Sequence, residues 1–308
     1  MPTPVYSIII PHYNIPDLLM RCLASIPVRE DIQVIVVDDC SPGADAYPDR
    51  YPALSRPFLE LYHTPVGGSA GRARNVGLDH AEGKWVIFMD ADDLFVSDME
   101  DILKEAEDRP EDILFYRYRS VLSEDITKAG TRVYYYRLFE DYKKNGDERR
   151  FRYDYDPVVG KIIRNDLIKK NNIRCSESRF ANDALFSLKC GTFADTIAIM
   201  DLTFILVTER DGSLTTSIDS KQRHPVEEYQ NRLTIAMEAH RFMLAHRVTY
   251  LNEGYKWFSE LFFQTWPAEF ILFYFKTILR RYPDFARPVA SHIVHWSFRR
   301  IRGIFKRT

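Results

Sequence analysis

The stretch KWVIFMDADD, residues 84–93, decides the fold. Its apolar part, residues 86–89, predicts a strand buried on both faces, because it is continuously apolar and contains β-branched and aromatic residues. Three carboxylates, Asp90, Asp92 and Asp93, follow at once. Ligands bind where the strands of an open parallel sheet end, and a divalent cation relieves the repulsion among such acids. A solvated acidic turn before a helix explains the same run equally well.

Strand-like and helix-like segments alternate along the first 122 residues. Helices are expected after Pro16, after a cap at Ser69 and after a capping box at Ser97 and Glu100. The expected strands are residues 5–11, 32–37, 58–63, 86–89 and 112–118. Such alternation predicts βαβ units and a mostly parallel sheet flanked by helices.

The loops that follow the strands of such a sheet all fall on one edge. This placement gathers Tyr13, Asp39, Arg74, Asp90 and Asp92, which are far apart in the sequence, into one region. The sequence therefore predicts a polar site along that edge.

The second half of the chain shows weaker patterns. Residues 120–155 are expected to be irregular, with a hairpin around residues 133–138, and Asn182 is expected to cap a helix. Further strands are expected at residues 158–163, 196–200 and 204–208, and helices at residues 166–170, 252–265, 268–281 and 285–304. The composition becomes helical from Pro225, which predicts a first domain of residues 1–220 and a helical extension of residues 221–308.

The composition describes an ordinary globular chain. Hydrophobic residues make up 45% and charged residues 28% of its 308 residues, and the formal net charge of −2 implies no attraction to nucleic acid. Four cysteines without a CxxC pair favour reduced thiols in a cytoplasmic protein. We expect no signal peptide, because the first residues lead into a strand, and no spanning helix, because polar residues interrupt residues 261–279.

Two pairs of charged residues are candidates for binding a nucleotide. Asp38 and Asp39 end a strand, where a carboxylate can accept the N–H of a pyrimidine ring or hold a ribose hydroxyl. Alternatively, they bond backbone amides in a turn. Arg72 and Arg74 near a helix start suit phosphate oxygens, although solvated surface charge is an equal explanation.

Asp90-Ala91-Asp92 is the metal candidate, because alternating acids in a turn can hold one cation against a diphosphate. Asp183 opens a helix, where an acid can act as a general base toward a hydroxyl or simply favour the helix dipole. The eight histidines do not cluster, so none is assigned to a metal. Apolar residues among arginines in residues 293–305 suit either an interfacial membrane helix or a domain-packing helix.

Four segments taken together resemble the family 2 inverting glycosyltransferases of the GT-A fold, of the bacterial surface-polysaccharide type. They are SIIIPHYN at 7–14, VIVVDDCS at 34–41, GGSAGRARNVGLDHAEGKWVIFMDADD at 67–93 and FANDALFSL at 180–188. The resemblance implies a Rossmann-like α/β catalytic domain over residues 1–220. It also implies transfer of a sugar from a nucleoside-diphosphate donor, expected to be a UDP-sugar, to a hydroxyl of a glycan or lipid-linked acceptor.

The resemblance implies a donor-binding role for five residues. Pro11 and Tyr13 would line the nucleotide pocket, with Tyr13 near the base. Asp39 would accept a hydrogen bond from the uracil ring, and Asp38 would support it. Arg74 would face the diphosphate.

The resemblance also implies roles in the transfer reaction for four further residues. Asp92, together with Asp90, would engage Mn²⁺ or Mg²⁺ on the diphosphate, and Asp183 would be the general base. Lys161 would help to place donor or acceptor. One departure concerns the base, since the glutamate that precedes it in the family is Asn182 here.

Three alternatives accompany this interpretation. A non-catalytic nucleotide-sugar-binding or scaffold protein with a GT-A-like fold is kept open by Asn182, whereas the retained acids argue against it. Phosphatases of the haloacid dehalogenase type also use a D-x-D strand end but want Thr or Val where Leu94 stands. Sugar nucleotidyltransferases need a glycine-rich signature that is missing after the first strand. By analogy with polysaccharide assembly enzymes, we expect a cytoplasmic protein, peripheral at the inner face of the cell membrane through its basic C-terminal helix.

Overall fold

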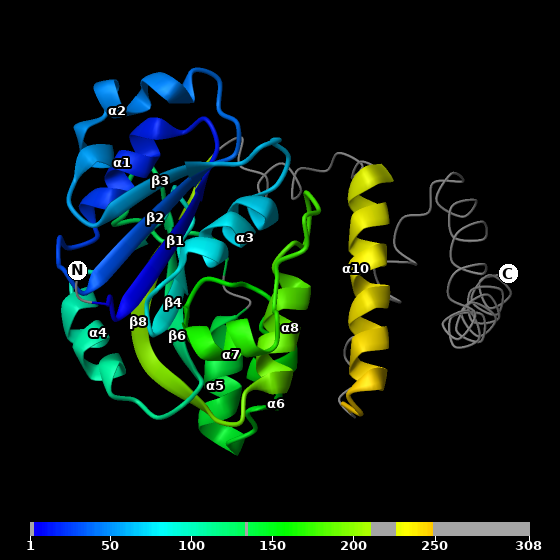
Figure 1. Cartoon of the computed structure of the whole chain (residues 1–308). Helices are drawn as coiled ribbons and strands as arrows, with labels where there is room; N and C mark the ends of the chain where they lie inside the picture. Colours follow the sequence, from blue (N-terminus) through cyan, green and yellow to red (C-terminus); the bar gives the residue numbers. More distant parts are fainter. Residues whose placement is uncertain (1–2, 133–134, 211–225, 249–308) are drawn as a thin grey trace, which may run out of the picture. The chain divides into compact units, whose positions relative to one another are not determined.

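The computed structural model describes residues 3–132, 135–210 and 226–248. The chain divides into two units, Met1–Gln222 and Arg223–Thr308. In the first unit, helices pack against an eight-stranded sheet with the strand order β3-β2-β1-β4-β7-β6-β8-β5 (Figure 1). The division into a domain and an extension at residues 220 and 221 stays a prediction.

The first half of the sheet is parallel. Its strands are β1 (Tyr6–His12), β2 (Ile32–Asp38), β3 (Leu59–His63) and β4 (Trp85–Phe88). β1 lies between β2 and β4, and all pairings in this half are parallel. Each strand begins and ends within two residues of its predicted bounds. β1, β2 and β4 are buried, because continuous apolar runs mark strands covered on both faces, whereas the less apolar β3 is only partly buried.

The two faces of β1 feed two separate hydrophobic clusters. Ile8 and Ile10 belong to one cluster, while Ile9, which points to the opposite face, belongs to the other. The sheet is therefore the central layer of the unit. Its rigid strand ends position the polar residues that follow them.

The helices of the first half are α1 (Pro16–Ala24), α2 (Tyr47–Arg50), α3 (Ala70–His80) and α4 (Met99–Glu107), with short 3₁₀ turns at Ala44–Ala46 and Pro52–Ser55. Pro16 occupies the first turn of α1, and the Oγ of Ser69 accepts the N–H of Arg72 at 3.2 Å, both as predicted. The capping box at Ser97 is wrong. Ser97 donates to the carboxylate of Asp98, and α4 begins one residue later.

The second half of the sheet mixes strand directions. Its strands are β5 (Leu94–Phe95), β6 (Ile113–Leu122), β7 (Lys161–Arg164) and β8 (Ile197–Glu209). β7 lies antiparallel between β4 and β6, β5 is antiparallel to β8, and β6 and β8 are parallel. The sheet is thus mixed, with four parallel pairings and three antiparallel ones. The two short strands predicted at residues 196–208 form one strand, whose register shifts where Asp201 and Thr203 interrupt the apolar run.

The remaining helices of this unit are α5 (Tyr136–Asn145), α6 (Arg149–Tyr153), α7 (Asn165–Lys170) and α8 (Ala184–Phe193). The hairpin predicted around residues 133–138 is wrong from residue 136 onward, where α5 begins. Phe139 and Tyr142 lie on one face of α5, and both rings contact Phe151. These aromatic residues show no clear helical period in the sequence, yet they form one face of a helix.

In the second unit the structure describes α10 (Val226–Ala245). The helices predicted at residues 252–265, 268–281 and 285–304 lie outside the described residues. Within the described ranges, every helix is too short or too polar to cross a membrane.

Candidate active site

Asp38 is fixed at the end of β2 by its neighbours. Its Oδ2 accepts from Nδ1 of His12 at 2.9 Å, and its Oδ1 accepts from the N–H of Ser41 at 2.7 Å. Burial by itself raises the pKa of Asp38, but the hydrogen bonds from His12 and Ser41 outweigh it and lower the pKa. Asp38 therefore bonds a backbone amide in a turn, which is one of the two roles considered for this carboxylate. Asp38 braces the loop that Asp39 belongs to.

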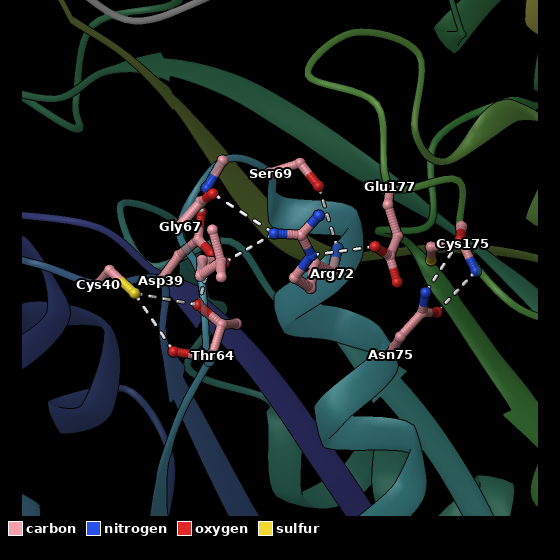
Figure 2. Close-up of polar contacts among 11 residues, drawn as sticks. Asp39, Cys40, Thr64, Gly67, Ser69, Arg72, Asn75, Cys175 and Glu177 are labelled. Carbon is pink, nitrogen blue, oxygen red and sulfur yellow. Dashed lines mark hydrogen bonds and ion pairs between the residues drawn. The ribbon is translucent and has the colours of Figure 1, made fainter.

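Asp39 is buried between two loops at the predicted edge. Its Oδ1 accepts from Oγ1 of Thr64 at 2.8 Å and its Oδ2 accepts from the N–H of Gly68 at 2.8 Å (Figure 2). Each oxygen keeps a second lone pair for a ligand. Of the two residues expected beside a nucleotide base, Pro11 is partly buried and Tyr13 is 57% exposed.

Arg74 joins two predicted parts of the site. Its Nη2 donates to Oδ1 of Asp90 at 2.7 Å, and its Nη1 donates to Oδ1 of Asn182 at 2.6 Å. The guanidinium is enclosed, since Arg74 is 5% exposed. Asn182 was expected to cap the next helix, and this expectation is wrong. Asp183 takes the cap position of α8, because the side chain of Asn182 is committed to Arg74.

The three acids after β4 have different surroundings. Oδ2 of Asp92 lies 3.1 Å from Nε of Arg210, and buried Asp93 accepts the N–H of Thr208 at 2.7 Å. Burial, followed by the charge of Asp90, raises the pKa of Asp92, and the same causes together with Asp92 raise the pKa of Asp93. Negative charge is therefore crowded in this turn. Asp93 bonds the backbone of β8, whereas Asp90 contacts Arg74 and Asp92 contacts Arg210.

The donor set suits a cation that is shared with a substrate. Among residues 3–132, 135–210 and 226–248, no group of three or more His, Cys, Asp or Glu side chains is arranged to hold a metal ion. The chain thus offers the two carboxylates of Asp90 and Asp92. Magnesium is commonly bound by one or two carboxylates plus substrate phosphates, so these residues fit a metal that arrives with a diphosphate.

Asp183 and Lys161 lie behind this turn. Burial raises the pKa of Asp183, and the positive charge of Arg74 opposes this rise. Lys161 is 1% exposed, and its Nζ donates to the carbonyl of Tyr155 at 2.8 Å. Burial lowers the pKa of Lys161 to about 8. A side chain so enclosed is not exposed for direct contact with a ligand.

Arg72 and Asn75 tie α3 to the segment before α8 (Figure 2). Nε of Arg72 lies 3.0 Å from Oε2 of Glu177, and its Nη1 donates to the carbonyl of Val66 at 2.8 Å. Asn75 exchanges two hydrogen bonds with the backbone of Cys175. Of the two arginines weighed for phosphate binding, Arg72 is therefore a structural link.

Arg210 is a site residue that sequence reasoning missed. It follows β8 directly, beyond the last strand predicted in this unit. Its contact with Asp92 joins residues 118 positions apart. The sequence carries no local signal for such a pair beyond the positive charge itself.

An α/β sheet with an acid-edged site of this kind belongs to a known class. The chain matches the profile of glycosyl transferase family 2 over residues 7–171, and it belongs to this family. The phosphatase and nucleotidyltransferase alternatives are thereby set aside.

Individual relatives cover the chain unevenly. TarS from Staphylococcus aureus, a poly(ribitol-phosphate) beta-N-acetylglucosaminyltransferase, is 26% identical over 76% of this chain and 40% of TarS. The glycosyltransferase EpsJ from Bacillus subtilis is 28% identical over 69% of this chain and 63% of EpsJ. The chain thus spans less than two thirds of each relative.

A solved structure of TarS resembles this chain in fold. The crystal structure of TarS residues 1–349 with UDP-GlcNAc superposes with a TM-score of 0.58 at 25% identity, over 76% of this chain and 66% of that one. The predicted α/β architecture of the GT-A type is thereby confirmed.

Proposed function

We propose that this chain is an inverting glycosyltransferase that moves a sugar from a UDP-sugar to a hydroxyl of a bacterial surface glycan or lipid-linked acceptor. The observation that carries the proposal is the fork of Arg74, which joins Asp90 in the acidic turn to Asn182 beside Asp183. The proposed site of the departing diphosphate and the residue beside the proposed base are thus linked through the guanidinium of Arg74. The activity named for TarS and the UDP-GlcNAc in its structure support the donor and the acceptor class.

The nucleotide would bind at the end of β2. Asp39 is held by Thr64 and Gly68, so its remaining lone pairs point in fixed directions toward the N–H of a uracil ring. Tyr13 is exposed at the same edge, where its ring can cover the base. Pro11 closes the end of β1 beside it.

Asp90 and Asp92 would hold Mn²⁺ or Mg²⁺ together with the diphosphate. Such an ion neutralises charge on a departing diphosphate. Arg74 contributes a second, permanent positive charge from within the protein, and its enclosure makes that charge more effective than it would be in water. Binding of the ion requires Asp92 to exchange its contact with Arg210.

Asp183 would take the proton of the attacking hydroxyl. Burial raises its pKa, which makes the carboxylate a better proton acceptor than a solvated one. The acceptor oxygen then bonds the anomeric carbon while the bond to the diphosphate breaks on the opposite side. Because the oxygen attacks from the side opposite to the departing diphosphate, the configuration of the anomeric carbon is inverted.

A second candidate is a non-catalytic nucleotide-sugar-binding protein. Asn182 favours it, because the side chain before the proposed base carries no charge. Both candidates bind a UDP-sugar, but only the first releases UDP from it.

The test is metal-dependent UDP release from a panel of UDP-sugars in the presence of acceptor. We expect Asp183→Asn to bind donor in a thermal-shift assay but to lose about 10³-fold or more in transfer. Asp166→Asn is the matched control, since Asp166 is an exposed acid at the start of α7. Equal turnover in both variants would leave Asp183 with only a helix-dipole role.

We also propose that the protein works at the inner face of the cell membrane. The basic and aromatic residues near the C-terminus support this location. Sedimentation of the full chain with anionic vesicles tests it. Neutral variants at Arg299, Arg300 and Arg302 should sediment less, and unchanged sedimentation would contradict the proposal.

A further inference from the structure

Three tyrosine rings, those of Tyr118, Tyr135 and Tyr155, form a row in which each ring contacts the next. The ring centroids of Tyr118 and Tyr135 are 6.2 Å apart, and those of Tyr135 and Tyr155 are 5.0 Å apart. Tyr155 is buried, whereas Tyr118 and Tyr135 are partly exposed. The proposed mechanism leaves these rings without a role.

The residue that follows Tyr155 is joined to the first turn of α8, the helix that begins after the proposed base. The N–H of Ser187 donates to the carbonyl of Asp183 at 2.9 Å, while its Oγ donates to the carbonyl of Asp156 at 2.6 Å. Both aspartates are thereby attached to the first turn of α8. Asp156 directly follows Tyr155 and is exposed.

Two further contacts fix this arrangement. Nζ of Lys161 bonds the carbonyl of Tyr155 and lies 5.0 Å from the centroid of its ring. Tyr155 therefore cannot move independently of β7. The buried ring is a rigid backing for Tyr135 rather than part of a mobile loop.

Electrostatic coupling supports the same placement. Burial, followed by the charges of Asp156 and Asp183, raises the pKa of Tyr135. Burial raises the pKa of Tyr118 too, and the charge of Asp93 adds to it. The charge of Asp93 in the acidic turn thus acts on Tyr118 at one end of the row, and the charges of Asp156 and Asp183 act on Tyr135 in its middle.

We propose that Tyr118, Tyr135 and Asp156 form the acceptor subsite, which takes a polyhydroxylated unit, either a cyclic sugar or an open-chain polyol. The proposal rests on the proposed function. Aromatic rings cover the C–H face of such a unit, and the carboxylate of Asp156 accepts one of its hydroxyls beside the hydroxyl that Asp183 deprotonates. The two acids disfavour phosphate here, so a polymer enters with its hydroxyl groups first.

The test separates acceptor binding from donor chemistry. We expect Tyr135→Ala to raise the KM for the acceptor at least tenfold while hydrolysis of the donor without acceptor changes less than twofold. Tyr135→Phe keeps the ring and should stay within about threefold of wild type. Asp156→Asn should raise the acceptor KM about fivefold.

Matched controls lie one or two residues away. Tyr136→Ala removes a 53% exposed ring that stacks with Arg117, and Asp154→Asn removes an acid that faces Arg150. Neither should change the acceptor KM. An acceptor KM of Tyr135→Ala within twofold of wild type would overturn the proposal.

If the wild type releases no UDP from any donor, the proposed function is wrong. The acceptor subsite is then tested by a binding measurement that does not depend on turnover. Saturation-transfer NMR with methyl β-glucoside and with ribitol reports contact directly. Contact with either probe that Tyr135→Ala abolishes supports the subsite and tells cyclic from open-chain acceptors. The absence of contact with both probes in wild type overturns it.

Discussion

The two halves of the sheet hold their proposed ligands in different ways. In the half built from β1, β2 and β4, the two carboxylates after β2 are braced by backbone N–H groups, Asp38 by that of Ser41 and Asp39 by that of Gly68. In the half built from β6, β7 and β8, the proposed groups come from separate segments, such as Tyr135 and Asp183. The nucleotide side is therefore set by short loops, whereas the acceptor side depends on how distant segments pack.

The halves meet along the first turns of α3. Arg74 contacts Asp90 on one side and Asn182 on the other, and Arg72 and Asn75 reach Glu177 and Cys175. Changes on either side of this joint, or in it, test the comparison.

Apart from Asp183→Asn, the largest effect is expected from Asp92→Asn, which removes a carboxylate of the acidic turn. Removing one of two cation-binding carboxylates should lower metal-dependent UDP release by about 10²-fold or more and weaken the Mn²⁺ dependence of UDP binding. Titration of Mn²⁺ into the UDP complex measures this. The exposed neighbour Asp98→Asn is the control, and an unchanged Mn²⁺ titration of Asp92→Asn would contradict the assignment.

Gly71→Ala should disrupt the joint, that is, the contact between the first turns of α3 and the segment before α8. A Cβ at Gly71 would lie 2.0 Å from the carbonyl oxygen of Ser176, and backbone cannot rotate away. We expect the free energy of unfolding to fall by about 2–3 kcal/mol. Urea denaturation measures it.

Gly77→Ala is the comparator within the first half. Its Cβ would meet Cγ2 of Ile9 at 2.4 Å, a side chain that has some freedom to shift. The expected cost is smaller, about 1–2 kcal/mol. Equal costs for both variants would show that the joint is no tighter than the core.

Lys161→Met should change how stability depends on pH. Because the pKa of Lys161 is lowered from 10.5 to about 8 in the folded protein, the unfolded chain binds more protons between these pH values. Its burial penalty is therefore present in full below pH 8 and is relieved as pH rises toward 10.5. Relative to Lys161→Met, wild type should gain about 1.5 kcal/mol between pH 8 and pH 9.5.

Urea unfolding of both proteins at the two pH values checks this prediction. Lys169→Met is the control, because the Lys169 side chain lies on the surface of α7. A constant stability difference between wild type and Lys161→Met would mean that Lys161 titrates as a solvated lysine.

The smallest effect is expected for the exposed pair of Arg72 and Glu177. A double-mutant cycle with alanine should give a coupling energy of roughly 0.2–1 kcal/mol, which falls in high salt. A coupling above about 2 kcal/mol would mean that this pair, rather than Gly71 and Arg74, holds the halves together.

Most of the first half of the fold could be predicted because β1, β2 and β4 are continuous apolar runs that end in polar or charged residues. The acidic turn at Asp90 was recognised as a candidate site for the same reason. The second half shows weaker signals. Asp201 and Thr203 interrupt the apolar run of β8, so one strand looked like two.

The remaining expectations failed because they depend on side-chain contacts between residues that are far apart in the sequence. Asn182 has the chemistry of a helix cap, and nothing local shows that Arg74, 108 positions earlier, recruits it. Arg210 and Asp92 are likewise joined only by folding. Contacts of this range follow from the packing of the whole unit, which the local pattern of a sequence does not encode.

The fork of Arg74 has a thermodynamic consequence. If occupancy of the acidic turn shifts this guanidinium, it also shifts the residue that precedes Asp183, and the two substrates become linked. Linkage of binding is reciprocal, so the factor by which donor changes acceptor affinity equals the factor by which acceptor changes donor affinity. A single arginine would then set the size of that factor.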